Sequence, residues 1–530
     1  MHYCGKTIIA GVLGALMLNF SVHAQWIMSP AEAQRYAQGS FPDYLDSLML
    51  SNDSDVSSDI QRNLSWMDTA FKKRGFTTYT IPNGAHPMLY AEWGTMQASR
   101  KTVLFLLHFD GPPVTASEWS SEPFKPTLKY KDNRNIWQPL PNERLMQSAI
   151  DPEWRVFARS SSDGKGVIGM FLAAIDALKG NGAPPAVNIK VLLDSEEERG
   201  SPHLMSVVTQ NAARLKNDGV VVLNGAMMSN DNPLITLGYR GSIQVDMTVF
   251  GPDPAAHSGA FGNIVINPAQ QLATLLAGLK DADGRVTLPG FYDRVKLSDE
   301  ERQLMAKQAP PKGAIENRYG VTQLDKVAAN PVEAVQYPSL DIIGLKSGDT
   351  GRKAIYAIPS TATASLNIRT VPETSPDYLY DLLKRYVLAK GFYLTRSDAP
   401  SLQERNHNPK LIAMNMLTAG GSSYAVRTQF GAPLAKWVSE GLTATRKVEP
   451  DKNRMLGVSP PINGALAQLK SAFAVVPLVN ADNNAASYDE NLRVGNYLEG
   501  VRTLVSLLTT PFPADEPEPP RQSAQSIKTR

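Results

Sequence analysis

Three short runs of apolar residues constrain the fold of this chain most strongly. They lie at residues 102–107, 187–193 and 220–223 and consist mainly of Val, Leu, Ile and Phe. Such runs are typical of strands that are buried on both faces of a parallel sheet. An apolar helix is predicted at residues 166–178, between the first two runs. This alternation predicts an α/β fold, with a mostly parallel sheet covered by helices on both faces.

The hydrophobic pattern changes after residue 238. Residues 242–250 and 365–371 alternate between apolar and polar side chains, as strands with one solvated face do, whereas residues 268–279 and 376–390 have the pattern of helices. A chain of 530 residues is also too long for one ordinary domain. We therefore predict that a smaller α/β lid domain is inserted into a larger catalytic domain. The predicted parts are residues 25–238 and 433–509 for the catalytic domain and residues 239–432 for the lid.

The start of the chain has the composition of an export signal. Lys6 precedes an apolar stretch at residues 8–20, and small residues follow up to Ala24. The alternative is an uncleaved membrane anchor, but a membrane span needs about 20 apolar residues, which is longer than this stretch. The sequence thus predicts a signal peptide at residues 1–24, a periplasmic or secreted protein, and no membrane association after cleavage.

Composition limits the chemistry that the mature chain can use. The only cysteine, Cys4, lies inside the predicted signal, so a metal site has to use His, Asp and Glu. The 53 basic and 51 acidic residues are mixed along the chain, which gives no basic surface for a nucleic-acid partner. The last segment, residues 510–530, contains five prolines and is predicted to be a disordered tail.

Polar clusters follow the predicted buried strands, at the edge where α/β sheets usually bind ligands. His108 and Asp110 come directly after the first strand and are two residues apart, so on an extended segment they point the same way. This motif suits equally a His ligand that is oriented by a carboxylate and an ordinary pair in a loop. Asp163 opens the predicted apolar helix and, taken alone, suits a helix N-cap better than a metal ligand.

Three adjacent carboxylates, Glu196, Glu197 and Glu198, follow the second predicted strand. Like charges at this spacing repel one another unless a cation or solvent relieves them. One carboxylate can bind a metal ion while its neighbour acts as general base on a metal-activated water. A solvated acidic helix start is the alternative. His257 lies in the predicted lid, and its meaning depends on the other clusters.

The order, spacing and placement of these clusters resemble the zinc metallo-exopeptidase family that includes carnosinase, carboxypeptidase G, aminoacylase and succinyl-diaminopimelate desuccinylase. The resemblance extends from Tyr44 to Leu508 and includes the segments Pro338-Ser339-Leu340 and Ile368-Arg369-Thr370-Val371-Pro372. It implies a catalytic domain that binds two zinc ions and an inserted lid that often mediates dimerisation. It also implies hydrolysis of amide bonds in dipeptides and N-acyl amino acids.

The resemblance implies a role for each residue of the catalytic domain that matches the family's motifs. His108 would bind one metal ion, Asp163 would bridge two, and Glu198 would bind the other. Glu197 would act as the general base, and Asp110 would orient His108.

The lid would contribute two further residues. By the same resemblance, His257 would stabilise the oxyanion, and Arg369 would hold the substrate carboxylate. The histidine that matches His257 often acts across a dimer in this family. The resemblance therefore implies a small peptide or N-acyl amino acid as substrate and allows a homodimer.

Two of the five metal ligands that the family leads us to expect do not match. Asn224 stands where an Asp or Glu follows the third strand, and Ala486 stands where the C-terminal motif has a His. Histidine does not recur after His407, so no small shift of register supplies one. Each of two metal ions would lose one protein ligand. Even the loss of a residue that only supports a ligand costs about 10- to 100-fold in affinity.

Three functions remain open. The one we favour is a metal-dependent amidohydrolase or exopeptidase that acts on dipeptides or N-acyl amino acids, with one or two zinc ions at an incomplete site. The same fold can instead bind such a ligand without cleaving it, or it can carry out other amide chemistry. The retention of Asp163, Glu197 and Glu198 favours a bound cation, because these carboxylates would otherwise hold uncompensated charge.

Overall fold

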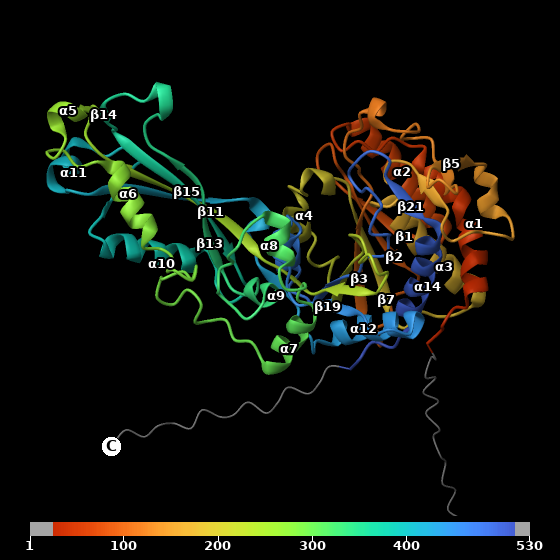
Figure 1. The fold of residues 1–530 in the computed structure, drawn as a ribbon. Helices are drawn as coiled ribbons and strands as arrows, with labels where there is room; N and C mark the ends of the chain where they lie inside the picture. The colour runs from red at the N-terminus through yellow and green to blue at the C-terminus, as the bar shows by residue number, and fades with distance from the viewer. Residues whose placement is uncertain (1–24, 515–530) are drawn as a thin grey trace, which may run out of the picture.

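The computed structural model describes residues 25–514. The predicted signal peptide at residues 1–24 and residues 515–530 of the predicted tail lie outside the described residues. Figure 1 shows two lobes: a large one that contains both ends of the described chain, and a smaller one built from its middle. Among the described helices, none is long and apolar enough to cross a membrane.

The large lobe is built on an eight-stranded sheet. In its middle, β3 (Thr102–His108) pairs in parallel with β7 (Asn188–Asp194) and with β8 (Gly219–Val222). The three apolar runs of the sequence thus form neighbouring parallel strands, as predicted. The full sheet order is β1-β2-β7-β3-β8-β20-β9-β19. The other strands are β1 (Phe76–Ile81), β2 (Met88–Trp93), β20 (Phe473–Val475), β9 (Leu234–Thr236) and β19 (Asp451–Asn453).

Helices cover both faces of this sheet, and the side chains of β3 alternate between the two resulting cores. Phe105 and Leu107 belong to the larger core, whereas Leu104 and Leu106 belong to the smaller one. The larger core is covered by α1 (Pro30–Leu48), α2 (Ser57–Lys73), α3 (Lys165–Asn181), α12 (Pro433–Arg446) and α14 (Val494–Thr509), and the smaller one by α4 (Leu204–Gln210) and α13 (Asn463–Leu469). The predicted α/β architecture is confirmed, although β1 and β2 pair antiparallel at one edge.

A second sheet in the large lobe was not predicted from the sequence. Its order is β21-β6-β4-β5. Here β21 (Asn491–Arg493) pairs with β6 (Arg155–Phe157) in antiparallel register, and β4 (Thr127–Lys131) and β5 (Trp137–Leu140) complete the sheet. This pairing brings the C-terminal segment beside the stretch that leads to Asp163.

The small lobe contains a five-stranded sheet in the order β13-β15-β11-β17-β16. Along β11 (Gly241–Phe250), buried and partly exposed residues alternate strictly, because α6 (Pro268–Ala277) and α10 (Pro376–Ala389) cover only one face. The other strands are β13 (Ser339–Lys346), β15 (Thr361–Thr370), β17 (Leu411–Thr418) and β16 (Tyr393–Leu394). The segment lies within the range predicted for an inserted α/β lid.

The chain remains packed where the disordered tail was predicted to begin. Thr510 is buried, and its carbonyl oxygen accepts a hydrogen bond from Trp437 Nε1 at 2.8 Å. Phe512 lies against Trp437, with ring centroids 5.4 Å apart. Residue 510 therefore belongs to the packed lobe rather than to the predicted tail. The prediction placed it in the tail because the sequence pattern did not reveal this aromatic contact.

Candidate active site

His108 lies at the end of β3 and is held between two carboxylates. Its Nδ1 is 3.3 Å from Asp110 Oδ1, and its Nε2 is 3.0 Å from Asp163 Oδ1. Burial would lower the pKa of His108, but the charge of Glu197 and the bonds to Asp110 and Asp163 raise it well above its usual range. The predicted pairing of His108 with Asp110 is thus present, and the neighbouring acids favour the charged form of the imidazole.

The Asp163 loop is held by a buried carboxylate from the other end of the chain. Glu490 accepts hydrogen bonds from the backbone N–H groups of Ser160, Ser162 and Asp163, each at 2.9 Å. It also accepts one from Arg159 Nη1 at 3.0 Å, and it is fully buried. The sequence contained Glu490 in the C-terminal motif but did not indicate this role.

Gly164 lets the Asp163 loop approach His108 closely. Its φ is +95°, and a Cβ atom at this position would lie 2.7 Å from the His108 carbonyl oxygen. An L-residue with a side chain would therefore be strained here.

Glu197 and Glu198 lie in the short turn η3 (Glu197–Arg199), directly after β7 and Ser195-Glu196. Burial raises the pKa of Glu197; the charge of His108 opposes this rise, and the charge of Asp163 adds to it. Burial likewise raises the pKa of Glu198 to about 8, again with opposition from His108 and support from Asp163. The Glu198 Oε1 atom is buried without a hydrogen-bond partner in the described part of the chain.

The third acid of the run, Glu196, faces away from this cluster. Its carboxylate accepts from the His203 backbone N–H at 2.9 Å and lies 3.1 Å from His203 Nδ1. Asn224, in contrast, faces the cluster, because its Nδ2 donates to Glu197 Oε1 at 3.0 Å. Of the three adjacent carboxylates, two therefore belong to the candidate site.

The side chains that meet at this site suit a divalent cation by their chemistry more than by their arrangement. His108, Asp163 and Glu198 supply one imidazole and two carboxylates, a ligand set that zinc accepts. The buried, unpaired Glu198 Oε1 and the raised pKa of Glu198 are the features of a carboxylate that lacks a cation. Yet no group of three or more His, Cys, Asp or Glu residues in the range 25–514 is arranged to hold a metal ion. In particular, His108 bonds directly to Asp163.

The two altered positions lie differently in the structure. Asn224 bonds to Glu197, whereas Ala486 is exposed in the loop before β21. Ala486 has a left-handed backbone, with φ at +55°. Neither residue provides a charged ligand, so the structure does not supply what the sequence lacks at these positions.

The two lid residues of the predicted site lie in very different places. Arg369, near the end of β15, donates from Nη1 to Ser459 Oγ at 2.9 Å and so connects the two lobes. Burial lowers the pKa of Arg240 to about 10, and the charge of Arg369 adds to this effect, which indicates that two guanidinium groups share the junction. A carboxylate is the natural partner for such a pair.

His257 is not brought to the cluster within one chain. It is exposed beside α5 (Ser258–Phe261), and its Nδ1 accepts a hydrogen bond from the Gly259 backbone at 3.1 Å. Figure 1 shows α5 at the outer end of the small lobe, far from β3 and β7. His257 could thus act only in the active site of a second subunit.

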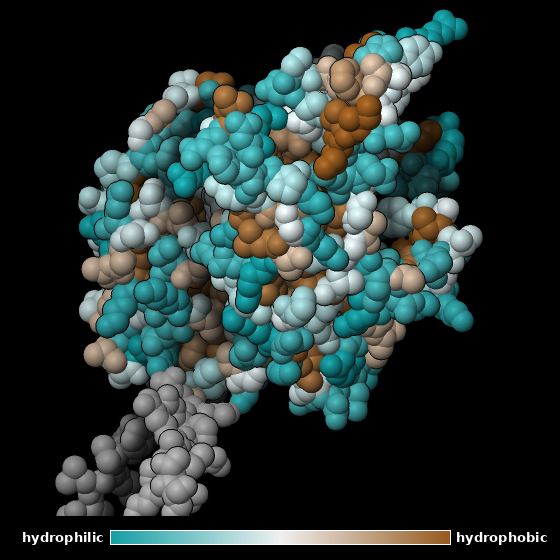
Figure 2. Space-filling view, turned by 90° about the vertical axis from the view of Figure 1, so that its left-hand side faces the viewer, coloured by the Kyte–Doolittle hydropathy of each residue, from teal (hydrophilic) through white to brown (hydrophobic). Residues whose placement is uncertain are grey.

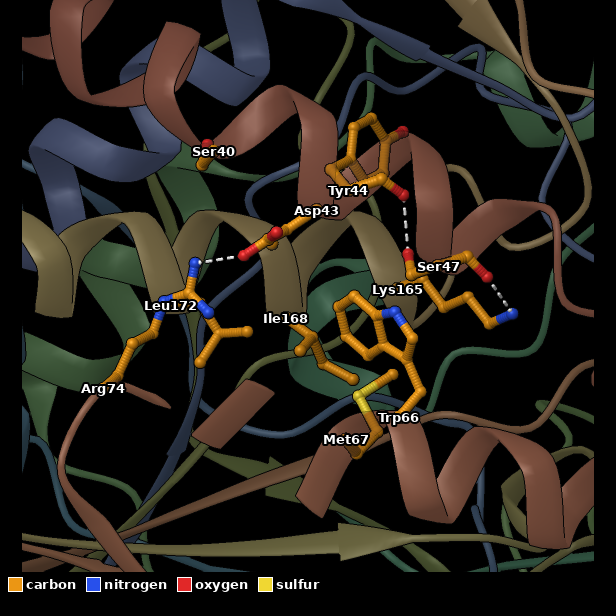
Figure 3. A pocket seen from close by; sticks show the side chains of 11 residues that line it. Ser40, Asp43, Tyr44, Ser47, Trp66, Met67, Arg74, Lys165, Ile168 and Leu172 are labelled. Carbon is orange, nitrogen blue, oxygen red and sulfur yellow. Dashed lines mark hydrogen bonds and ion pairs between the residues drawn. The ribbon is translucent and has the colours of Figure 1, made fainter. Parts of the chain in front are cut away.

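Lys165, two residues after Asp163, has a structural role. Its Nζ donates to the carbonyl oxygens of Ser47 and Leu50 at 2.8 and 2.7 Å, and burial lowers its pKa to about 7. Figure 3 shows Lys165 beside a small cavity that is also lined by the Arg74–Asp43 ion pair. The cavity measures about 10 Å³, which is room for one water at most. The side chains around this cavity therefore hold α3 against α1, and the cavity is too small to bind a substrate.

Comparison with known proteins agrees with this fold. The M20 peptidase dimerisation domain matches residues 237–391. The Cys-Gly metallodipeptidase dug1 of Schizosaccharomyces pombe is 26% identical over 433 residues, which are 78% of this chain and 81% of that protein. The human Beta-Ala-His dipeptidase is 26% identical over 407 residues, which are 74% of this chain and 76% of that protein.

Solved structures show the same fold. The M20 family metallo-carboxypeptidase Sso-CP2 from Sulfolobus solfataricus has a TM-score of 0.63 and 24% sequence identity, over 89% of this chain and 98% of that one. The chain is therefore similar to M20 peptidases in sequence and in fold, and residues 237–391 match their dimerisation domain. The family resemblance that the sequence motifs predicted is confirmed.

Proposed function

We propose that this protein is a metal-dependent amidohydrolase that cleaves dipeptides or N-acyl amino acids. The observation that carries the proposal is the pair Glu197 and Glu198, both with a raised pKa, held beside His108 and Asp163 at the ends of parallel strands. Partly buried carboxylates with perturbed pKa values are typical of catalytic sites. The metallodipeptidases to which the chain is similar support this substrate class.

Several residues of this chain have distinct roles in the proposed amide hydrolysis. Glu197, oriented by Asn224, takes a proton from the attacking water and delivers it to the leaving nitrogen. Arg369 binds the carboxylate of the substrate, and Asp110 fixes the ring of His108. A divalent ion such as zinc, if bound by His108, Asp163 and Glu198, would supply polarisation of the substrate carbonyl and acidification of the water.

A second candidate function is binding of the same ligands without cleavage. The neutral Asn224 and the exposed Ala486 favour it, because neither residue provides a charged or imidazole ligand to a metal ion. The two functions differ in what Glu197 does. It is a proton carrier in the first, and only a hydrogen-bonding group in the second.

One experiment separates the two functions. The protein purified with zinc or manganese is tested for metal content by elemental analysis and for cleavage of a dipeptide panel. We expect at least one ion per chain, and cleavage that disappears in Glu197→Gln while dipeptide binding remains. Glu196→Gln is the matched control, because Glu196 faces His203, and it should keep most of the activity. Binding without cleavage in every metal would refute the hydrolase and support the binding protein.

We also propose that the protein is a homodimer. On β13, the edge strand of the lid sheet, Ile342, Ile343 and Leu345 are 49%, 58% and 62% exposed. Exposed apolar residues on an edge strand are a typical contact between subunits. Figure 2, which looks onto the lid side, shows apolar patches among the hydrophilic residues of this face. In such a dimer, His257 of one subunit could reach the active site of the other.

Finally, we propose that the protein is exported to the periplasm or secreted. The proposal rests on the sequence pattern of residues 1–24. N-terminal sequencing of the mature protein should begin at Gln25, and a mature chain that still begins at Met1 would contradict it.

A further inference from the structure

A cavity of about 240 Å³ opens beside Glu197 and Asn224. Its walls come from the ends of β8, β9 and β20 and from the segment that follows β19. The buried residues Val222, Leu234 and Val475 line it, together with Leu456 and Ile462. The cavity thus lies in the large lobe, directly next to the proposed general base.

The lining of this cavity is mostly apolar. Among the described residues that line it, Glu197 is the only one with a charged side chain. The Thr236 hydroxyl already accepts a hydrogen bond from Asn453 Nδ2 at 3.3 Å, which leaves little polar surface for a ligand. Burial of a charged group in such surroundings would be costly, because no opposite charge other than the base is present.

Tyr239 gives the cavity one flat aromatic wall. Its ring stacks on Phe473, with centroids 6.5 Å apart and an interplanar angle of 14°. Burial raises the pKa of Tyr239 to about 12, and the charge of Glu197 adds to this rise, so the hydroxyl stays protonated at neutral pH. An aromatic wall that faces aliphatic ones is suited to an aliphatic or aromatic side chain.

We propose that this cavity binds one uncharged, apolar side chain of the substrate, next to the bond that is cleaved. The inference rests on the proposed function and narrows its substrate class to dipeptides or acyl amino acids with a Leu-, Met- or Phe-like side chain. The volume suits one side chain rather than a whole ligand, since complete ligand pockets measure about 300–1,000 Å³. The rest of the substrate then lies towards Arg369 and the lid.

The test compares dipeptides that differ only in one side chain. Affinity is measured by calorimetry with Glu197→Gln, and kcat/KM with the wild-type protein, for Gly-Gly, Leu-Gly, Gly-Leu, Phe-Gly, Lys-Gly and Glu-Gly. We expect the affinity and the kcat/KM for Phe-Gly or for one of the leucine peptides to exceed those for Gly-Gly by roughly 10- to 100-fold, because apolar pockets discriminate to this extent. The affinity and the kcat/KM for Lys-Gly and Glu-Gly should be no higher than those for Gly-Gly. Equal affinity across the panel, or a preference for Lys-Gly, would overturn the inference.

Two variants of one loop test whether this peptide preference arises in the cavity. Ala226 lines the cavity, so Ala226→Phe should fill it and bring the ratio of kcat/KM for the preferred peptide to kcat/KM for Gly-Gly close to one. Met228 is exposed on the same loop outside the cavity, so Met228→Phe should change nothing. Equal effects of both variants would place the binding site elsewhere. If the panel shows the preference in binding but no peptide is cleaved, the cavity is confirmed and the hydrolase is refuted.

Discussion

The side-chain amide of Asn224 donates a hydrogen bond to Glu197 Oε1 over 3.0 Å. At the position of Asn224 the family has a carboxylate, which would repel Glu197 unless a cation lay between the two. The amide instead stabilises the ionised form of Glu197 and so opposes the rise in pKa that burial causes. This contact relieves the charge of Glu197 without a cation, but Asn224 provides no charged ligand to a metal ion.

Asn224→Asp should make the stability of the protein more dependent on metal. Without metal, the new carboxylate would repel Glu197 and lower the melting temperature. With zinc, it would act as a ligand and should raise the affinity by about tenfold or more. Melting curves in chelator and in zinc measure both effects, with Asn224→Ala as the control that removes the amide without adding charge. A zinc-induced shift equal to that of the wild type would argue against a metal at this position.

Combining this change with Ala486→His should raise the number of metal ions bound per chain. Ala486 has a φ of +55° and is exposed, and histidine tolerates this backbone region better than most residues. The double variant has five charged or imidazole ligands, as the family does. Elemental analysis after dialysis should give close to two ions per chain, against one or fewer in the wild type. An unchanged metal content would mean that the loop before β21 lies out of reach of the cluster.

Glu490→Gln should destabilise the protein strongly. The carboxylate accepts bonds from three backbone N–H groups and from Arg159, and all of these residues except the half-buried Asp163 are buried with it. Removing one partner of a buried charged pair costs about 3–5 kcal/mol. Urea unfolding measures the loss. Glu499→Gln is the control, because its partner Arg502 is less buried, and it should cost about 0–1 kcal/mol. Similar costs for both variants would show that Glu490 does not hold the Asp163 loop.

The sequence was sufficient for those parts of the site that follow from local patterns. The buried strand β3 and the polar residues after it are adjacent in the chain, so His108 and Asp110 could be placed at a strand end without a structure. The same holds for Glu197 and Glu198 after β7. The choice of two acids out of the run of three could not be made, because it depends on His203, which draws Glu196 away.

The parts that sequence did not provide depend on contacts between distant segments. The pairing of β21 with β6 joins strands of three residues each, and such short strands carry almost no periodic pattern. The role of Glu490 depends on this pairing. The cavity beside Glu197 was missed for the same reason, because its walls come from segments as far apart as Val222 and Val475.

The free energy of unfolding of the metal-free protein should fall as the pH rises from about 4 to 7, through Asp194. Burial and the charge of Asp110 raise the pKa of Asp194 to about 7 in the folded chain, from 3.8. The folded state therefore holds a proton that the unfolded state releases, and the resulting stability is lost as the pH rises through this window, by up to about 4 kcal/mol. Asp194→Asn should reduce this slope, to which the raised pKa of Glu198 also contributes, and urea unfolding at pH 5 and pH 8 measures the change. Equal slopes in both proteins would exclude Asp194 as the cause.

Charge placed on β13 should separate the proposed dimer. Ile343 and Leu345 are exposed on the edge strand of the lid sheet, and a lysine at either position would face its counterpart across a two-fold contact. Ile343→Lys with Leu345→Lys should therefore give the mass of one chain by light scattering, whereas the wild type gives two. Tyr319→Lys is the control, since Tyr319 is a similarly exposed residue that belongs to α8 (Ala314–Tyr319) and not to β13. If His257 acts in the partner's site, the monomeric variant should also lose cleavage while its dipeptide affinity changes less. A double variant that remains dimeric would place the contact on another face.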